Sequence, residues 1–301
     1  MKWFTWYSVV LCIIWCMGHA VPVFGQQTTD TVTYKPVEFP AGYSALLNTV
    51  YTQVGDWQGK MDIYLPPQSV SPSPVVINIH GGGWNHGVKE SQTGFSTFFK
   101  AGWAVANMEY RLTGQATAPA AVEDARCALI YLNKNAAALN IDPKKIVVMG
   151  GSAGGHLALM AGLLGNDHRF DGNCPGVEEI QVAAIINKYG VADVGDWAFG
   201  PNIRSKSATN WLGPRANDEA FVRSVSPINY VSKNNPPVFI VHGDADPTVP
   251  YQQSVALHKK LLEAGVRTEF ITVPGGLHGK FDKQTNSDIN KAIMRFIGAN
   301  L

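Results

Sequence analysis

One stretch of this chain, Ile146–Leu164, constrains the fold more than any other. It begins with a short apolar run, 146–149, which is typical of a strand buried on both faces of a sheet. It ends with 156–164, a segment without Asp, Glu, Lys or Arg that is typical of a buried helix. Because glycines lie between the two, the chain can turn sharply from strand to helix. The sequence therefore predicts a strand, a tight turn and a helix that pack together in a hydrophobic core.

The turn itself has the sequence Gly150-Gly151-Ser152-Ala153-Gly154, a G-x-S-x-G pattern. In a strand-to-helix turn of this kind, the central residue adopts a strained backbone conformation and exposes its hydroxyl group. The N-terminus of the following helix directs free N–H groups and the positive end of its dipole toward the same place. We therefore predict that Ser152 is a nucleophile, with an ordinary Gly-rich turn as the alternative.

The rest of the chain alternates strands with helices, and a hydrophobic content of 46% suffices for a sizeable core. Apolar and β-branched runs predict strands at 49–54, 60–65, 75–79, 103–108, 182–187, 238–242 and 267–273. Further helices are predicted at 118–139, 252–264 and 287–297. This alternation is typical of an α/β fold, with a mostly parallel sheet and helices on both faces. The periodicity breaks down at about 190–235, where we expect a small cap-like insertion.

The N-terminal residues 1–25 have the pattern of a secretory signal peptide. A single basic residue precedes the apolar run Val9–Met17, and Val23-Phe24-Gly25 ends in the small residue that signal peptidase prefers. The apolar run is too short to span a bilayer, so an N-terminal membrane anchor is the less favoured alternative. We expect the protein to be secreted or periplasmic, with 26–44 as an irregular leader and 45–301 as one folded domain.

Loss of the signal peptide would leave 23 basic and 23 acidic side chains, because only one of the 24 basic residues lies in it. This balance argues against a nucleic-acid partner and against stable insertion or docking at a membrane. Two cysteines, Cys127 and Cys174, would remain. A pair in an oxidising compartment is compatible with a disulfide, and two separate thiols are the alternative.

A nucleophilic serine needs a general base, and His278 is the favoured histidine. It lies in the Gly-rich loop Pro274–Gly279 after the last predicted strand, where its ring can extend over the edge of the sheet. The carboxylate that orients this base is expected at Asp246. The alternative, Asp244, follows its strand so closely that it is better placed to tighten the turn by accepting backbone hydrogen bonds. The order Ser152, Asp246, His278 is that of the α/β-hydrolases.

The third requirement is a site that stabilises a developing negative charge. The sequence His80-Gly81-Gly82-Gly83 follows a predicted strand, and bare glycines let backbone N–H groups approach an oxyanion closely. We predict that the N–H groups of Gly82, Gly83 and Ala153 form this oxyanion hole. A flexible Gly-rich loop is the alternative.

Together these motifs resemble those of the α/β-hydrolase carboxylesterases. The resemblance covers most of residues 45–299 and rests on the triad order and on the segments His80–Trp84, Glu109–Leu112, Gly150–Gly155 and His242–Pro250. Within that class the chain is most similar to the bacterial bifunctional feruloyl and acetyl-xylan esterases. Hormone-sensitive-lipase-like esterases share part of the pattern, but they usually have Asp where this chain has Gly151. The resemblance also implies that Arg111 and Asp124 pair to hold a strand against a helix.

The resemblance implies a secreted serine esterase that hydrolyses short acyl or aromatic acyl esters, such as acetyl or feruloyl groups on plant polysaccharide. Its substrate would be a small-molecule or polysaccharide ester, and its oligomeric state is left open. The aromatic candidates for an acyl or sugar site, although such residues more often belong to a core, are Trp84, Trp197, Phe199 and Trp211.

No cofactor or metal is expected, because the sequence has no His-Glu-x-x-His or paired-Cys motif and no G-x-G-x-x-G spacing at Gly150–Gly155. Two rival functions remain. One is an amidase or peptidase of the same fold, like the kynurenine formamidases or oligopeptidases. The other is a non-catalytic binding module built on a hydrolase fold.

Overall fold

The computed structural model describes residues 1, 33–68, 71–174, 179–201 and 204–301. Contacts divide the chain into two units, Met1–Thr33 and Tyr34–Leu301, and every described helix and strand belongs to the second. Apart from Met1, the expected signal peptide lies outside the described residues.

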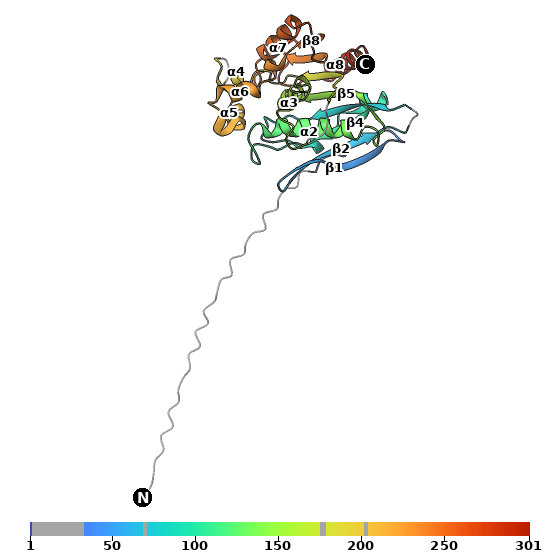
Figure 1. Ribbon diagram of the computed structural model, residues 1–301, viewed down its shortest axis with the longest axis horizontal. Coiled ribbons are helices and arrows are strands. Elements are labelled where there is room, and N and C mark those ends of the chain that lie inside the picture. Colours follow the sequence, from blue (N-terminus) through green and yellow to red (C-terminus); the bar gives the residue numbers. More distant parts are fainter. Residues whose placement is uncertain (2–32, 69–70, 175–178, 202–203) are drawn as a thin grey trace. The chain divides into compact units, whose positions relative to one another are not determined.

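An eight-stranded sheet forms the centre of the second unit (Figure 1). Its strands are β1 Ser44–Val54, β2 Trp57–Leu65, β3 Ser73–Ile79, β4 Ala104–Met108, β5 Ile141–Gly151, β6 Ala184–Lys188, β7 Val238–Gly243 and β8 Thr268–Val273. They lie in the order β1-β2-β4-β3-β5-β6-β7-β8. The pairs β1–β2 and β2–β4 are antiparallel, and every other neighbouring pair is parallel. The carboxyl ends of β3 and β5–β8 therefore meet at one edge of the sheet.

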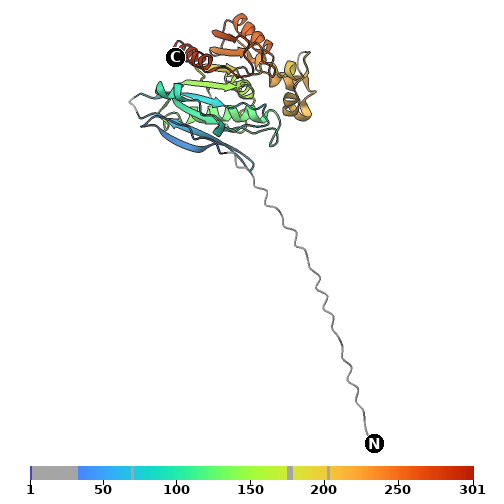
Figure 2. The ribbon, with the colours of Figure 1, turned by 180° about the vertical axis from the view of Figure 1, so that it is seen from behind.

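Helices cover both faces of this sheet, which Figure 2 shows from behind. They are α1 Ser96–Lys100, α2 Ala120–Lys134, α3 Ala153–Leu163, α7 Gln252–Glu263 and α8 Lys283–Gly298. Side chains alternate between two hydrophobic clusters, so that Ile77 packs with α2, α3 and α7, whereas Val76 packs with α1 and α8. The predicted α/β fold, a mostly parallel sheet with helices on both faces, is confirmed.

Between β6 and β7 the chain forms three short helices, α4 Val194–Phe199, α5 Lys206–Leu212 and α6 Glu219–Ser224. Each begins at a side-chain cap, in which Asp193, Ser205 or Asp218 accepts a hydrogen bond from a backbone N–H three residues later. Helices of this length show no clear apolar period, which is why the sequence predicted only an irregular cap-like insertion here.

Two further details refine the expectations. The segment before β1 has no helix or strand from Thr33 to Tyr43, yet the Tyr43 hydroxyl donates to the carbonyl oxygens of Phe99 and Trp103 at 3.0 and 3.1 Å. The structure also joins Cys127 on α2 to Cys174 in a disulfide, with Cα atoms 5.4 Å apart. Of the two alternatives left open for the cysteines, the structure therefore has the disulfide.

Candidate active site

Ser152 lies in the turn between β5 and α3, with a φ of +57°. Such a positive value is rare in residues other than glycine. The backbone N–H of Ser152 donates to the carbonyl oxygen of Lys188 on β6 at 2.9 Å. A Cβ atom on Gly154 would collide with the carbonyl oxygen of Ile79 on β3, so only glycine lets α3 start this close to the sheet. The turn therefore holds the serine at the carboxyl edge of the central strands.

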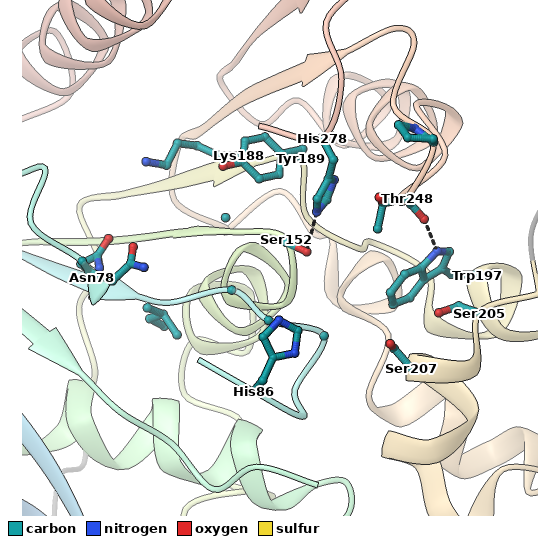
Figure 3. A pocket seen from close by; sticks show the side chains of 17 residues that line it. Asn78, His86, Ser152, Lys188, Tyr189, Trp197, Ser205, Ser207, Thr248 and His278 are labelled. Atoms are coloured by element: carbon teal, nitrogen blue, oxygen red, sulfur yellow. Dashed lines mark hydrogen bonds between the residues drawn. The ribbon is translucent and has the colours of Figure 1, made fainter. Parts of the chain in front are cut away.

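His278 lies in the loop between β8 and α8, and its ring reaches Ser152 (Figure 3). The Oγ of Ser152 is 2.8 Å from His278 Nε2, and His278 Nδ1 is 2.6 Å from Asp246 Oδ2. Because an ionised carboxylate can only accept, Nδ1 donates to Asp246, and Nε2 is left to accept a hydrogen bond from the serine hydroxyl. The side chain of His278 is 22% exposed, whereas that of Asp246 is fully buried.

The Asp246 carboxylate is held by four hydrogen bonds. Its Oδ1 accepts from the backbone N–H groups of Thr248 and Val249 at 2.7 and 3.0 Å. Its Oδ2 accepts from His278 and, at 3.1 Å, from Nε2 of His242. Burial alone would raise the pKa of Asp246, but the hydrogen bonds from His242, His278 and Thr248 lower it far below its usual range. The acid is therefore ionised at neutral pH.

The competing acid, Asp244, has a different position. It is exposed, and its Oδ1 accepts a hydrogen bond from the backbone N–H of Gly275 at 2.6 Å. This contact ties the loop after β7 to the loop after β8. The structure thus brings Asp246, and not Asp244, to His278.

His242 was not among the sequence-predicted site residues. It lies near the end of β7, fully buried, and its Nε2 faces two acceptors, Asp246 Oδ2 and the carbonyl oxygen of Val249. Nε2 must therefore carry the proton, and Nδ1 accepts from the Ser254 hydroxyl at 2.7 Å. The available signal was a histidine that ends a strand four residues before the acid.

The loop after β3 lies against the nucleophile. A Cβ atom on Gly81 would be 3.4 Å from that of Ser152. Gly82 has a φ of +116°, and a Cβ there would collide with the carbonyl oxygen of His86. Within the described residues, no hydrogen-bond acceptor pairs with the backbone N–H groups of Gly82, Gly83 and Ala153. These donors are available to a ligand near Ser152.

A cavity of about 660 Å³ opens beside Ser152 and His278. The glycine loop 81–83 and His86 form one wall, and Trp197, Ser205 and Ser207 of the insertion form another (Figure 3). Lys188, the last residue of β6, and Tyr189, which follows it, also line the cavity. The Tyr189 ring packs edge-on against His278, with ring centroids 4.9 Å apart. Sequence reasoning missed His86, Lys188 and Tyr189, because nothing in their local pattern marks a loop residue that faces a cavity.

Only one of the four aromatic candidates lines this cavity. Trp197 does so, and its Nε1 donates to the carbonyl oxygen of Thr248 at 3.0 Å. Trp84 and Trp211 are instead fully buried and stack on each other with ring centroids 4.3 Å apart. Phe199 is 45% exposed and lines a separate hollow beside α4 and α6. The expectation that Trp84, Phe199 and Trp211 line the substrate site is therefore corrected: Trp84 and Trp211 are core residues, and Phe199 lines a different hollow.

Two polar groups near the site, the Arg111–Asp124 pair and His80, have structural contacts. Arg111 holds Asp124 through its Nε and Nη2 atoms at 2.8–3.0 Å, as the resemblance implied, and joins the end of β4 to α2. His80 stacks on Tyr110 with ring centroids 4.3 Å apart, and burial lowers the pKa of His80 to about 4.

In the part of the chain that the structure describes, no group of three or more His, Cys, Asp and Glu side chains could hold a metal ion. No helix among those residues is long and apolar enough to cross a membrane.

A serine, a histidine and an aspartate joined by hydrogen bonds at the carboxyl ends of a mostly parallel sheet define an α/β-hydrolase. Residues 61–261 match the BD-FAE family, a range that includes Ser152 and Asp246 and ends before His278. The chain belongs to the BD-FAE family.

Comparisons with individual proteins agree with this class. The chain is 30% identical over 249 residues to the esterase LipQ of Mycobacterium tuberculosis, an alignment that covers 80% of this chain and 58% of LipQ. The chain spans about half the length of the curated relatives it matches, between 46% and 58% of three mycobacterial esterases.

Among solved structures, it is similar to a truncated form of a carbohydrate esterase from gut microbiota, with 31% identity, a TM-score of 0.75 and coverage of 87% of this chain and 99% of that chain. It is also similar to an acetyl ester-xyloside bifunctional hydrolase from Caldicellulosiruptor lactoaceticus, with 27% identity, a TM-score of 0.68 and coverage of 81% and 89%. The predicted resemblance to α/β-hydrolase carboxylesterases is confirmed.

Proposed function

We propose that this protein is a secreted serine carboxylic ester hydrolase that acts on short acyl or aromatic acyl esters. The observation that carries the proposal is the continuous hydrogen-bonded chain from Ser152 through His278 to Asp246, with distances of 2.8 and 2.6 Å. A general base within hydrogen-bond reach of the hydroxyl, itself oriented by a buried carboxylate, is what activates a serine for acyl transfer.

In this mechanism, Ser152 Oγ attacks the ester carbonyl carbon while His278 Nε2 takes the hydroxyl proton. The C–O bond to the alcohol then breaks, and the same nitrogen returns the proton to the leaving oxygen. A water molecule next attacks the acyl carbon while His278 takes its proton. The bond from that carbon to Ser152 Oγ then breaks, His278 returns the proton to Oγ, and the carboxylic acid leaves. Asp246 holds the required imidazole tautomer and stabilises the imidazolium that forms in each half of the reaction.

The oxyanion of each tetrahedral intermediate would be held by the backbone N–H groups of Gly82, Gly83 and Ala153. No acceptor among the described residues pairs with these N–H groups, and the glycine loop lies close to Ser152, which supports this role. Each such donor contributes about 3 kcal/mol of transition-state stabilisation in well-studied hydrolases.

For the substrate, we propose acetyl or feruloyl esters on plant polysaccharide. The names of two similar structures, a carbohydrate esterase and an acetyl ester-xyloside hydrolase, support a carbohydrate ester. The cavity of about 660 Å³ has room for an aromatic acyl group or a sugar ring, and Trp197 supplies an aromatic surface.

The proposal of secretion rests on the N-terminal pattern and is supported by the disulfide between Cys127 and Cys174, since structural disulfides persist in oxidising compartments. Expression of the full chain in a bacterial host, followed by mass measurement of the exported protein, tests it. A protein that begins at Gln26 supports secretion, and a membrane-bound chain that retains Met1 supports the anchor alternative.

A substrate panel tests the activity itself. We expect hydrolysis of 4-nitrophenyl acetate, 4-nitrophenyl butyrate and methyl ferulate, release of acetate from acetylated xylan, and little cleavage of a peptide 4-nitroanilide. Preferential cleavage of the anilide would support the amidase or peptidase alternative. No hydrolysis of any substrate by folded protein would support a non-catalytic binding module.

A further inference from the structure

The cavity beside Ser152 has an arm whose polar lining the proposed reaction does not use. We call it the polar arm, and define it by Asn78, Gln92, Gly151, Lys188 and Tyr189. In Figure 3, Lys188 and Asn78 lie on one side of Ser152, while Trp197, Ser205 and Ser207 lie on the other. The scissile ester bond would therefore sit between two chemically different regions.

Strand register places the polar arm on one face of the sheet. Lys188 pairs with Gly151, and Asn78 pairs with Met149, two residues earlier on the same central strand. Side chains alternate along each strand, so Asn78 and Lys188 point to the face that carries α1 and α8, as their neighbours Val76 and Ile186 do. Gly151 lies between them, and the Tyr189 ring lies so close that a Cβ atom on Gly151 would be 3.0 Å from the Tyr189 hydroxyl oxygen.

The Lys188 ammonium has no ion-pair or hydrogen-bond partner among the described residues. Lys89 provides the contrast, because its buried Nζ donates to Asp62 at 2.9 Å and to Glu90 at 2.6 Å. Burial lowers the pKa of Lys188, and no carboxylate in the described part of the chain opposes that effect. A partly buried cation without a counter-charge is unfavourable, and an anion that enters the cavity would relieve this cost.

Asn78 is a second unsatisfied group in the polar arm. It is only 5% exposed, and its Nδ2 donates to Asn107 Oδ1 at 3.0 Å. The Asn107 amide is itself oriented, because its Nδ2 donates to the carbonyl oxygen of Lys89 at 2.7 Å. The Oδ1 atom of Asn78 is therefore fixed as an acceptor, and it has no donor among the described residues. A ligand here would need a hydroxyl group as well as an acceptor for Lys188.

We propose that the polar arm recognises a carboxylate on the substrate through Lys188, so that the protein prefers esters whose acyl or alcohol portion carries a carboxylate. Asn78 accepts a hydrogen bond from a hydroxyl group of the same ligand, a combination that an acidic sugar offers. The inference rests on the proposed ester hydrolysis at Ser152 and adds the chemical class of the substrate.

Matched ester pairs test this selectivity. On the alcohol side the pair is 4-acetoxybenzoate and 4-acetoxybenzamide, and on the acyl side it is monomethyl succinate and methyl succinamate. Each pair differs only by a carboxylate in place of a neutral amide. The measured quantity is the ratio of kcat/KM within each pair, for wild type, Lys188→Met, Lys188→Arg and the exposed control Lys100→Met.

We expect wild type to prefer the carboxylate in at least one pair, and Lys188→Met to reduce that ratio by about tenfold or more, because a hydrogen bond to a charged group is lost. Lys188→Arg should retain part of the preference and Lys100→Met all of it. High salt should weaken the preference in wild type. A ratio near one in both pairs, or a preference that survives in Lys188→Met, overturns the inference.

A binding measurement separates this inference from the proposed reaction. Calorimetric titration of 4-acetoxybenzoate and monomethyl succinate into Ser152→Ala protein measures recognition without turnover. Binding that is weakened by an added Lys188→Met substitution supports carboxylate recognition even if no ester is hydrolysed, a result that would overturn only the proposed reaction. Equal binding with and without Lys188 overturns the inference.

Discussion

His242 and His278 both donate hydrogen bonds to one oxygen atom, Oδ2 of Asp246, at 3.1 and 2.6 Å. The first ring is fully buried behind the carboxylate, and the second reaches forward to Ser152. Two donors on one oxygen, with backbone N–H groups on the other, fix the carboxylate in position before any substrate binds. The acid is therefore preorganised by its own loop and by β7.

Replacement of His242 should impair turnover although the ring does not touch Ser152. In His242→Leu, the carboxylate loses one donor and some of its orientation, so we expect kcat to fall about tenfold or more with little change in KM. His242→Gln, whose amide can still donate, should recover much of the loss. Equal defects in both variants would indicate a packing role only.

The two acids after β7 should differ strongly in their effect on catalysis. Asp246→Asn should keep the fold and lower kcat by up to about 10⁴, because the amide favours the wrong tautomer of His278. Asp244→Asn should cost much less, since an amide oxygen can still accept the hydrogen bond from Gly275. Kinetic constants for both variants with one soluble ester decide the assignment. A crippled Asp244→Asn beside an active Asp246→Asn would reverse it.

The disulfide between Cys127 and Cys174 should stabilise the domain by closing a loop with a sequence separation of 47 residues. We expect the double variant Cys127→Ala/Cys174→Ala to lose about 3–4 kcal/mol of the free energy of unfolding, measured by urea titration. Thiol labelling of the denatured, non-reduced protein, after removal of residues 1–25, checks the bond itself. Two labelled cysteines in that experiment would rule it out.

His156 should make stability depend on pH. It is fully buried, its Nε2 donates to the carbonyl oxygen of Val225 at 2.8 Å, and burial lowers the pKa of His156 to about 4. Unfolding lets the ring bind a proton at pH values below about 6.5, so its contribution is present above that pH and is lost as the pH falls toward 4, by up to about 1.4 kcal/mol per pH unit.

The test compares the free energy of unfolding of wild type and His156→Gln at pH 7 and pH 4.5. A comparison is needed because Asp124, whose pKa burial raises to about 6 against the opposing effect of Arg111, titrates with the opposite sign. We expect the variant to lose less stability than wild type on acidification. An equal or larger loss in the variant contradicts this assignment.

The sequence was sufficient to place Ser152, Asp246 and His278 near one another. Each follows a predicted strand, and parallel strands bring their carboxyl ends to one edge, so chain order alone gives their proximity. The glycines of the two loops were equally informative. A Cβ atom at Gly82 or Gly154 would collide with a backbone carbonyl oxygen, so no residue other than glycine fits at these positions.

Side-chain direction in loops could not be predicted in the same way. Trp84 follows the glycine loop with a φ of +59°, which turns its ring into the core against Trp211 instead of into the cavity. The roles of His242 and Lys188 depend on which face of the sheet a side chain near the end of its strand occupies. That face depends on register with strands far away in the sequence.

The proposed reaction depends on the Ser152 hydroxyl as the nucleophile that attacks the ester. The most direct test is the kcat/KM of Ser152→Ala for 4-nitrophenyl acetate relative to wild type, with circular dichroism melting to verify the fold. Loss of the nucleophile should lower kcat/KM by about 10⁴-fold or more, while the melting temperature stays close to that of wild type. A folded Ser152→Ala protein that hydrolyses the ester at near the wild-type rate would contradict the account.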